Sequence, residues 1–339
     1  MKFLSQIATI ALLTGAPATA QALQYDAGRF SFKLTGYGTA GLIEPDFETP
    51  VFVGDWRVRG QLNYAANDKY TIGAVYALDA NAVDEDKFMR EGFIFTESRG
   101  MGRIELGFTD SVARKLGLGL PDVGGLRIND KPIFHKKITP DGPVISDTVI
   151  STGRGALRTN LVASNRGMQY GLSLAGLTDD YDWALDAGLK IRRPQGKVKT
   201  AYSFGASFMN NPDNFSTDVY TPNVTANWRA QVDAGFNLQY NSWVWGLSGR
   251  LIYDENPIGP ISDGLVVGTG VSYDLMKYSV SLTYMFSDTG IWDENVPDFH
   301  DHVVVGSFRY KYSEFVDGWM SLGITSDTPF VSAGLRLTF

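Results

Sequence analysis

The chain ends on FVSAGLRLTF, residues 330–339, in which apolar and polar residues alternate up to the last position. Successive side chains of a β-strand point to opposite faces, so one face of this segment carries Val331, Ala333, Leu335, Leu337 and Phe339. A bulky aromatic residue at a chain terminus is unusual in water because termini fray. It fits a membrane barrel, where every strand must be paired and aromatic rings favour the interface. The segment therefore predicts the closing strand of such a barrel.

The first residues are typical of an export signal. Met1 and Lys2 form a basic start, residues 7–13 are apolar, and ATAQA at 18–22 supplies the small residues of a cleavage site. Cleavage after Ala20 or after Ala22 fits this pattern, and we favour Ala22. Residues 1–22 are therefore predicted to be a signal peptide and residues 23–339 the barrel. The apolar core of the signal, and every later stretch, is shorter than the ~18 residues of a membrane-spanning helix.

Composition narrows the class of protein further. The chain has no cysteine, so disulfides, thiolate metal sites and cysteine nucleophiles are excluded. Its 37 acidic residues outnumber its 30 basic residues, which argues against a nucleic-acid partner. The mean hydropathy of −0.11 is compatible with a barrel that has a wet interior, because only alternate strand residues need be apolar.

Alternation with a period of two recurs along the whole chain and predicts sixteen strands. Their expected spans are 29–43, 51–66, 69–79, 87–97, 102–110, 157–165, 168–177, 181–192, 197–209, 225–241, 242–254, 263–274, 277–287, 302–313, 318–325 and 329–339. Links after even-numbered strands are short and most links after odd-numbered strands are long, except those after the seventh and fifteenth. Two unlike rims of this kind are typical of an up-and-down barrel. We predict an all-β fold, a 16-stranded antiparallel transmembrane β-barrel.

Aromatic residues gather near the ends of the predicted apolar faces, as expected of two interfacial girdles. They are Tyr37, Tyr64, Tyr70, Trp228, Tyr240, Trp243, Tyr253, Tyr273, Tyr278, Tyr310 and Tyr312. One residue conflicts with this scheme. In the alternation assigned to strand 87–97, Glu91 falls on the lipid-facing side. Arg90 then falls on the lumen side.

The link after the fifth strand, residues 111–156, is far longer than the others, and loops of such length are usually functional. It begins with SVARKL, where Ser111 can cap a helical turn, and continues to PDVGG at 121–125. With the sixteen strands and the terminal Phe339, this arrangement resembles the general diffusion porins of the Gram-negative outer membrane. In that family a long loop after strand five carries a Pro-acid-aromatic-Gly-Gly element, and here Val123 occupies the aromatic position.

The resemblance implies a loop that folds into the barrel and narrows the pore, with Asp122 as its carboxylate. It also implies a homotrimer, and a terminal aromatic residue, Phe339, that is read by the outer-membrane barrel-assembly machinery. We expect loop acids to face basic residues on lumen faces across the constriction, where opposed charges set ion preference. The candidate residues are Asp122, Asp130 and Asp141 on the loop and Lys33, Arg57, Arg59, Arg90 and Arg103 on the strands.

The sequence therefore predicts a non-enzymatic outer-membrane porin, a water-filled channel for passive diffusion of small hydrophilic solutes and ions. Its other expected contacts are outer-membrane lipid and lipopolysaccharide, with no nucleic acid. No cofactor is expected, although acidic outer loops such as 84–86 could hold a divalent cation. The alternatives are a solute-specific channel, an outer-membrane hydrolase using one of His135, His300 and His302, and a soluble secreted β-protein.

Overall fold

The computed structural model describes residues 23–45, 50–81, 89–124, 156–176, 183–210, 228–255, 264–289, 299–325 and 328–339. The predicted signal peptide lies outside these residues. The strands are β1 (Leu23–Ala27), β2 (Phe30–Pro45), β3 (Val51–Ala65), β4 (Tyr70–Asn81), β5 (Met89–Ser98), β6 (Gly102–Thr109), β7 (Ala156–Asn165), β8 (Met168–Ala175), β9 (Ala184–Gln195), β10 (Val198–Asn210), β11 (Trp228–Tyr240), β12 (Trp243–Glu255), β13 (Gly264–Leu275), β14 (Tyr278–Thr289), β15 (Phe299–Lys311), β16 (Val316–Thr325) and β17 (Thr328–Thr338). One short helix, α2 (Val112–Leu116), follows β6. Within the described ranges, no helix is long and apolar enough to cross a membrane.

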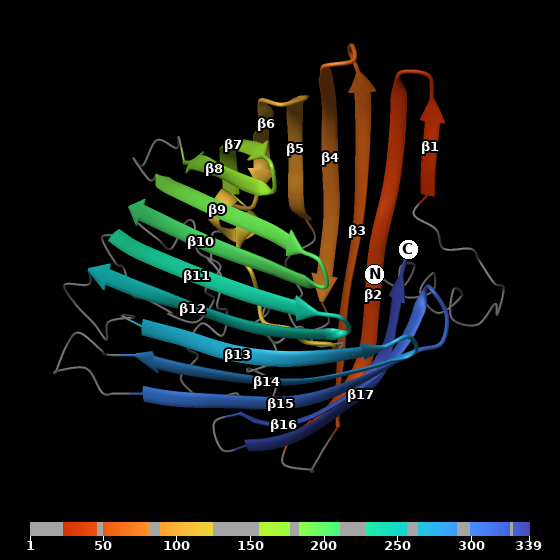
Figure 1. Cartoon of the computed structure of the whole chain (residues 1–339), viewed down its shortest axis with the longest axis vertical. Coiled ribbons are helices and arrows are strands. Elements are labelled where there is room, and N and C mark those ends of the chain that lie inside the picture. Colours follow the sequence, from red (N-terminus) through yellow and green to blue (C-terminus); the bar gives the residue numbers. More distant parts are fainter. Residues whose placement is uncertain are drawn as a thin grey trace.

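Strands β2 to β17 form one closed antiparallel barrel. Each strand pairs with its neighbours in the sequence, and β17 pairs with β2 to complete the ring (Figure 1). Each of the sixteen predicted strands coincides with one of these, and no predicted boundary differs from the observed one by more than three residues. The predicted 16-stranded barrel is confirmed.

The seam between the last and first barrel strands closes the ring, as predicted for the closing strand. β17 pairs with residues 37–45 of β2, and Phe339 exchanges two backbone hydrogen bonds with Gly36, at 2.8 and 2.9 Å. The remaining edge, residues 30–34, is covered by β1, which was not predicted and which folds back through a turn at Gly28. A five-residue strand is too short to give a clear alternating pattern.

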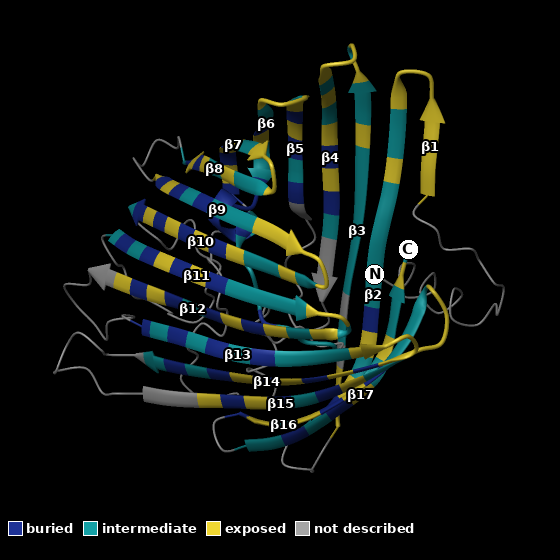
Figure 2. Ribbon diagram, in the orientation of Figure 1, coloured by how far each residue is buried: buried dark blue, intermediate teal, exposed yellow. Residues whose placement is uncertain are grey.

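Burial in this barrel is inverted relative to a water-soluble protein, as the bands along β9 to β12 in Figure 2 show. On β11, for example, Val232 on the outer face is 56% exposed, whereas Asp233 on the inner face is 2% exposed. The outer face carries exposed leucine, valine and aromatic side chains, and the inner face carries serine, threonine, arginine and acidic residues. Such an apolar band requires a cover of lipid or protein.

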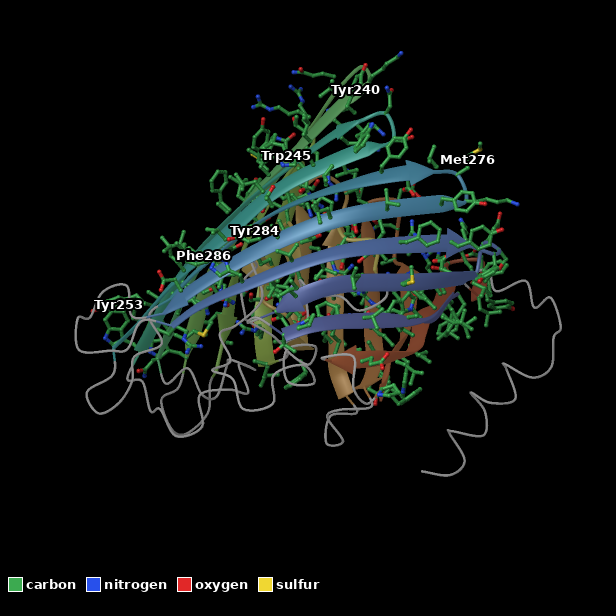
Figure 3. The ribbon with its side chains drawn as sticks, turned by 90° about the horizontal axis from the view of Figure 1, so that it is seen from below. Tyr240, Trp245, Tyr253, Met276, Tyr284 and Phe286 are labelled. Atoms are coloured by element: carbon green, nitrogen blue, oxygen red, sulfur yellow. The ribbon has the colours of Figure 1, made fainter. Side chains whose placement is uncertain are left out.

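Aromatic rings line both ends of this apolar band. At the rim with long links, Phe208, Trp228 and Tyr253 are neighbours, with ring centroids 5.6 and 5.2 Å apart. Figure 3 shows Tyr253 at this end of the strands and Tyr240 at the other. Trp228 and Tyr240 are twelve residues apart on β11, about 40 Å of strand, which a tilt of about 45° reduces to about 28 Å across the membrane.

The separation of about 28 Å between Trp228 and Tyr240 matches the hydrocarbon thickness of a bilayer.

Tyr37, one of the predicted girdle residues, instead belongs to the inner face, where its ring lies 5.4 Å from the guanidinium carbon of Arg336.

Candidate functional site

The chain turns into the barrel directly after β6. Ser111 caps α2 by accepting a hydrogen bond from the backbone N–H of Arg114 at 3.2 Å, which confirms the predicted helical turn. The helix packs against the inner faces of β8, β9 and β10. It approaches the wall closely because β9 has no side chain at Gly188: a Cβ there would lie 2.8 Å from the carbonyl oxygen of Val112.

Residues 117–124 then follow the inner wall across β10 to β16. The Leu118 N–H donates to Ser203 Oγ at 3.0 Å, and Ser248 Oγ donates to the Leu118 carbonyl at 2.8 Å. Farther along, Thr283 Oγ1 donates to the Pro121 carbonyl at 3.1 Å. The polar backbone of the loop is therefore satisfied by hydroxyl groups of the wall.

The wall residues under the loop share one property, which is small size. We call them the docking row: Gly171, Ser173, Gly188, Ser203, Gly235, Gly246, Ser248, Gly268, Gly270, Ser281 and Thr283. A Cβ on Gly246, for example, would lie 2.5 Å from Pro121 Cδ. The sequence analysis missed this row, although small residues at lumen positions of the seven strands β8 to β14 are visible once the loop path is known.

Each of the seven consecutive strands from β8 to β14 contributes at least one residue to the docking row. Asp122 lies at the far end of the row. Its Oδ1 accepts hydrogen bonds from the Gly124 N–H at 2.8 Å and from Ser281 Oγ at 3.3 Å. Burial raises the pKa of the Asp122 carboxyl, and these hydrogen bonds oppose the rise. The carboxylate is thus held at the wall, and its role at a constriction stays a prediction.

The predicted loop acids Asp130 and Asp141 lie outside the described residues, as does the rest of the loop from 125 to 155. The acidic outer-loop segment 84–86 also falls outside them. Among the side chains that the structure describes, no group of three potential metal ligands comes together.

The basic residues of β3 occupy the inner face, as the sequence predicted. Arg57 Nη2 lies 2.6 Å from Glu91 Oε2, and this pair joins β3 to β5 across β4. The phase predicted for strand 87–97 is therefore wrong: Glu91 faces the lumen, where its charge is neutralised by Arg57. Arg90 falls at a register shift between β4 and β5, where one residue is left without a partner position, and its side chain lies outside the described residues.

The same change of phase brings Phe93 and Phe95 to the inner face, where they are 4% and 3% exposed. Arg103 stacks on Phe95, with its guanidinium carbon 3.6 Å from the ring centroid. Glu105 holds this arginine at 3.0 Å and also pairs with Lys115 of α2. The base of the loop is thereby fastened to the wall between β5 and β7.

The other predicted cations of this wall are Arg59 and Lys33. Arg59 projects from β3 on the same face as Arg57, and Lys33 is exposed on β2, opposite Gln61. Neither has an ion pair with any side chain that the structure describes.

Under α2, the opposite wall contains a buried ion pair that the sequence analysis did not predict. Arg158 of β7 pairs with Asp186 of β9, and both side chains are fully buried. Ser207 donates a further hydrogen bond to Asp186 at 2.6 Å. Asp233 and Arg250 stand directly opposite each other on β11 and β12. The two-residue period of a sequence shows which face a side chain occupies. It does not predict pairs between strands that are not neighbours, such as β7 and β9.

His302, the one predicted histidine whose side chain is described, lies away from the lumen. It projects from the outer face of β15, where its Nδ1 is 2.8 Å from the hydroxyl oxygen of Tyr284. Figure 3 shows Tyr284 and Phe286 on this outer surface.

A closed barrel with an apolar outer band, two aromatic girdles and a polar, charged interior defines an outer-membrane channel. A family model described as Gram-negative porin matches residues 8–317. The chain belongs to the Gram-negative porin family. A search of curated protein sequences found no match.

Solved structures with the same fold share little sequence with this chain. Outer-membrane-expressed OmpT of Vibrio cholerae is 12% identical, with a TM-score of 0.64, and the match covers 94% of this chain and 100% of that one. An anion-selective porin from Comamonas acidovorans is 12% identical, with a TM-score of 0.63 and coverage of 91% and 100%. OmpF of Salmonella typhi, in complex with daunomycin, is 9% identical, with a TM-score of 0.64 and coverage of 94% and 100%.

Proposed function

We propose that this porin is a general diffusion channel for small hydrophilic solutes and ions. The observation that carries the proposal is the arrangement of the inner wall. The described start of the loop lies along β8 to β16, while the basic residues Arg57, Arg59 and Arg103 lie on the facing part of the ring, on β3 and β6. A passage between a docked loop and a charged wall suits hydrated solutes of many kinds.

The alternative, a solute-specific channel, would require a lining that recognises one class of solute. Inner-face aromatic residues do exist, among them Tyr37, Phe93 and Phe95. Phe93 and Phe95 are buried beneath Arg103 and Lys115, however, so they do not offer a continuous apolar track to a sugar.

Conductance across a planar bilayer tests the proposal. The purified protein is added to a bilayer in potassium chloride, and single-channel current is measured against voltage. General diffusion predicts ohmic current that neutral sugars reduce only through viscosity. A current that saturates with one solute, or that one solute blocks, would instead establish a specific channel.

The proposal includes the finer features that the resemblance implies. Residues 1–22 are a cleaved signal peptide, the loop over 111–156 narrows the pore, and three copies assemble in the outer membrane beside lipopolysaccharide. The assembly machinery recognises the terminal Phe339. Amino-terminal sequencing of the membrane-bound protein tests the first feature, with Leu23 expected as the first residue.

The channel is also proposed to lack enzymatic activity. The rival is a hydrolase that acts on lipid. Release of fatty acid from lipid vesicles by the purified protein, lost on replacement of His135 by alanine, would overturn the channel as the sole function.

A further inference from the structure

We propose that a groove on the outer face of β4 to β8 binds a phospholipid with an anionic headgroup, from the leaflet that faces the periplasm. The groove has a volume of about 420 Å³ and lies beside the short turns that join these strands (Figure 1). Short turns mark the periplasmic rim of an outer-membrane barrel. The inference goes beyond the proposed diffusion function, because it concerns the surface toward lipid and not the pore.

The floor of the groove is a row of small residues on three neighbouring strands. Ser98 of β5 stands opposite Gly102 of β6, and Ala163 of β7 comes next in the row. A larger residue at Gly102 would be strained, because its φ is 121° and a Cβ there would lie 2.2 Å from the carbonyl oxygen of Val162. The path of the backbone therefore sets the depth of the hollow at this point.

Apolar and aromatic side chains surround this floor. Tyr70 of β4 and Tyr170 of β8 stand at the two ends of the row, on strands that are four spacings apart, about 19 Å. Two residues farther from the turns, Ile104 and Leu161 form an apolar wall and are 47% and 48% exposed. Met101 covers the side toward the turns and is 67% exposed. The interfacial girdle is thus interrupted by an apolar hollow between two tyrosine rings.

Positive charge borders the groove at the short turns. Asp68 is the one acid within residues 66–69, 99–101, 166–167 and 193–197. Glu97 belongs to the inner face and lies 3.9 Å from Arg103. Each of the four consecutive hairpins of this part of the rim carries an exposed cation, and these are Lys69, Arg99, Arg166 and Arg193. The rim beside the groove therefore favours an anion.

An anionic phospholipid has both parts that this surface requires. Its acyl chain covers the apolar hollow, and its phosphate lies at the level of the charged turns. Arg99 directly follows the floor residue Ser98, and Arg166 comes three residues after Ala163. Their turns are two strand spacings apart, about 10 Å, so both guanidinium groups can reach one phosphate. Basic residues at a membrane surface strengthen the binding of anionic lipids, and the tyrosine hydroxyls add polar contacts at the same depth.

Native mass spectrometry of the full-length channel in a non-ionic detergent tests the inference. Dioleoyl-phosphatidylglycerol, which is anionic, is compared with dioleoyl-phosphatidylcholine, which has the same acyl chains and no net charge. The wild type is expected to bind one phosphatidylglycerol per chain. Its half-saturating concentration should be about tenfold lower than that of phosphatidylcholine, because the cations of the rim contact the phosphatidylglycerol headgroup.

The headgroup contact is tested by removing two charges. Arg99→Gln with Arg166→Gln should abolish the preference for phosphatidylglycerol and leave the binding of phosphatidylcholine unchanged. The matched control is Lys277→Gln with Lys311→Gln, which removes two charges from the same rim near β13 to β15, away from the groove (Figure 1). This control should bind both lipids like the wild type. Equal binding of the two lipids by the wild type, or a preference that the first variant retains, would overturn the inference.

The contact with the acyl chain is tested by filling the groove. Ala163→Phe should weaken the binding of both lipids, whereas Ala74→Phe, on the outer face of β4 and outside the groove, should not. Wild-type binding by Ala163→Phe would show that the lipid lies elsewhere and would overturn the inference. Wild-type conductance verifies that each variant is folded, and the absence of conductance in the wild type itself would overturn the proposed function alone.

A second copy of this chain is the other possible cover of the groove. Because the chain has no cysteine, Ala163→Cys places a single thiol on the floor. In vesicles this thiol is expected to react with a phospholipid that carries a maleimide on its acyl chain. Complete protection of the thiol in the assembled channel would show that protein covers the groove and would overturn the inference.

Discussion

Replacement of Gly188 tests whether the docking row holds the loop in place. A Cβ at this position would lie 2.8 Å from the oxygen and 3.0 Å from the carbonyl carbon of Val112. Both are backbone atoms, so no side-chain rotation relieves the contact. Since ordinary contacts begin at 3.4 Å, Gly188→Ala must move α2 by about 0.6 Å, the difference between 3.4 and 2.8 Å.

A larger side chain, Gly188→Leu, cannot fit beneath the helix. Its expected effect is the loss of the hydrogen bonds from Val112 N–H to Ser173 and from Leu118 N–H to Ser203, which measure 2.6 and 3.0 Å. Each contributes about 0.5–1.5 kcal/mol, so docking weakens by about 1–3 kcal/mol in total. The population of channels with an undocked loop should then rise about 5- to 150-fold.

The assay is the rate of current fluctuations in single channels, because a loop that leaves the wall changes the open cross-section. Gly188→Leu should fluctuate far more often than wild type, and Gly188→Ala only slightly more often. Gly306→Ala is the matched control, since the nearest atom to a Cβ there lies 3.8 Å away. Barrel folding is verified from the heat-dependent shift in electrophoretic mobility. A folded Gly188→Leu channel with wild-type fluctuations would refute the docking argument.

Three further outcomes are expected. Arg158→Leu should destabilise the barrel by about 3–5 kcal/mol, because it leaves Asp186 charged and buried, and Arg158→Leu with Asp186→Leu should recover most of the loss in urea unfolding. Because the pKa of Asp122 is raised in the docked loop, docking should be strongest at low pH and weaken as the pH rises through that value; current fluctuations should increase accordingly, and Asp122→Asn should remove this dependence. Deletion of Phe339 removes two backbone hydrogen bonds to Gly36 and should lower the fraction of folded barrel recovered from membranes.

The strands of this protein were predictable because each needs an apolar face toward lipid. That requirement acts on every second residue, so a period of two marks each strand, and the predicted boundaries lie within three residues of the observed ones. The prediction failed where a strand is too short to show this period or where an extra residue interrupts it. The five residues of β1 are too few to show a period, and the register shift before Glu91 reverses the phase of β5.

Less of the candidate site could be predicted from the sequence. Alternation identified which residues face the lumen, including Arg57 and Arg59, because a charge on the lipid face would be costly. It does not reveal which lumen charges neutralise one another. That depends on the path of the loop and on contacts that cross one or more strands, such as Arg57 with Glu91 and Arg158 with Asp186.

The geometry of the seam would allow the chain to be circularly permuted. Phe339 stands opposite Gly36 and Leu23 stands opposite Leu34, so only the position opposite Thr35 separates the end of β17 from the start of β1. After the proposed cleavage behind Ala22, a linker of about one to three residues would therefore join Phe339 to Leu23 without disturbing the sheet. Circularly permuted chains, opened at another turn, would then end on a different strand. They would separate the role of the terminal aromatic residue in barrel closure from its proposed role in recognition during assembly.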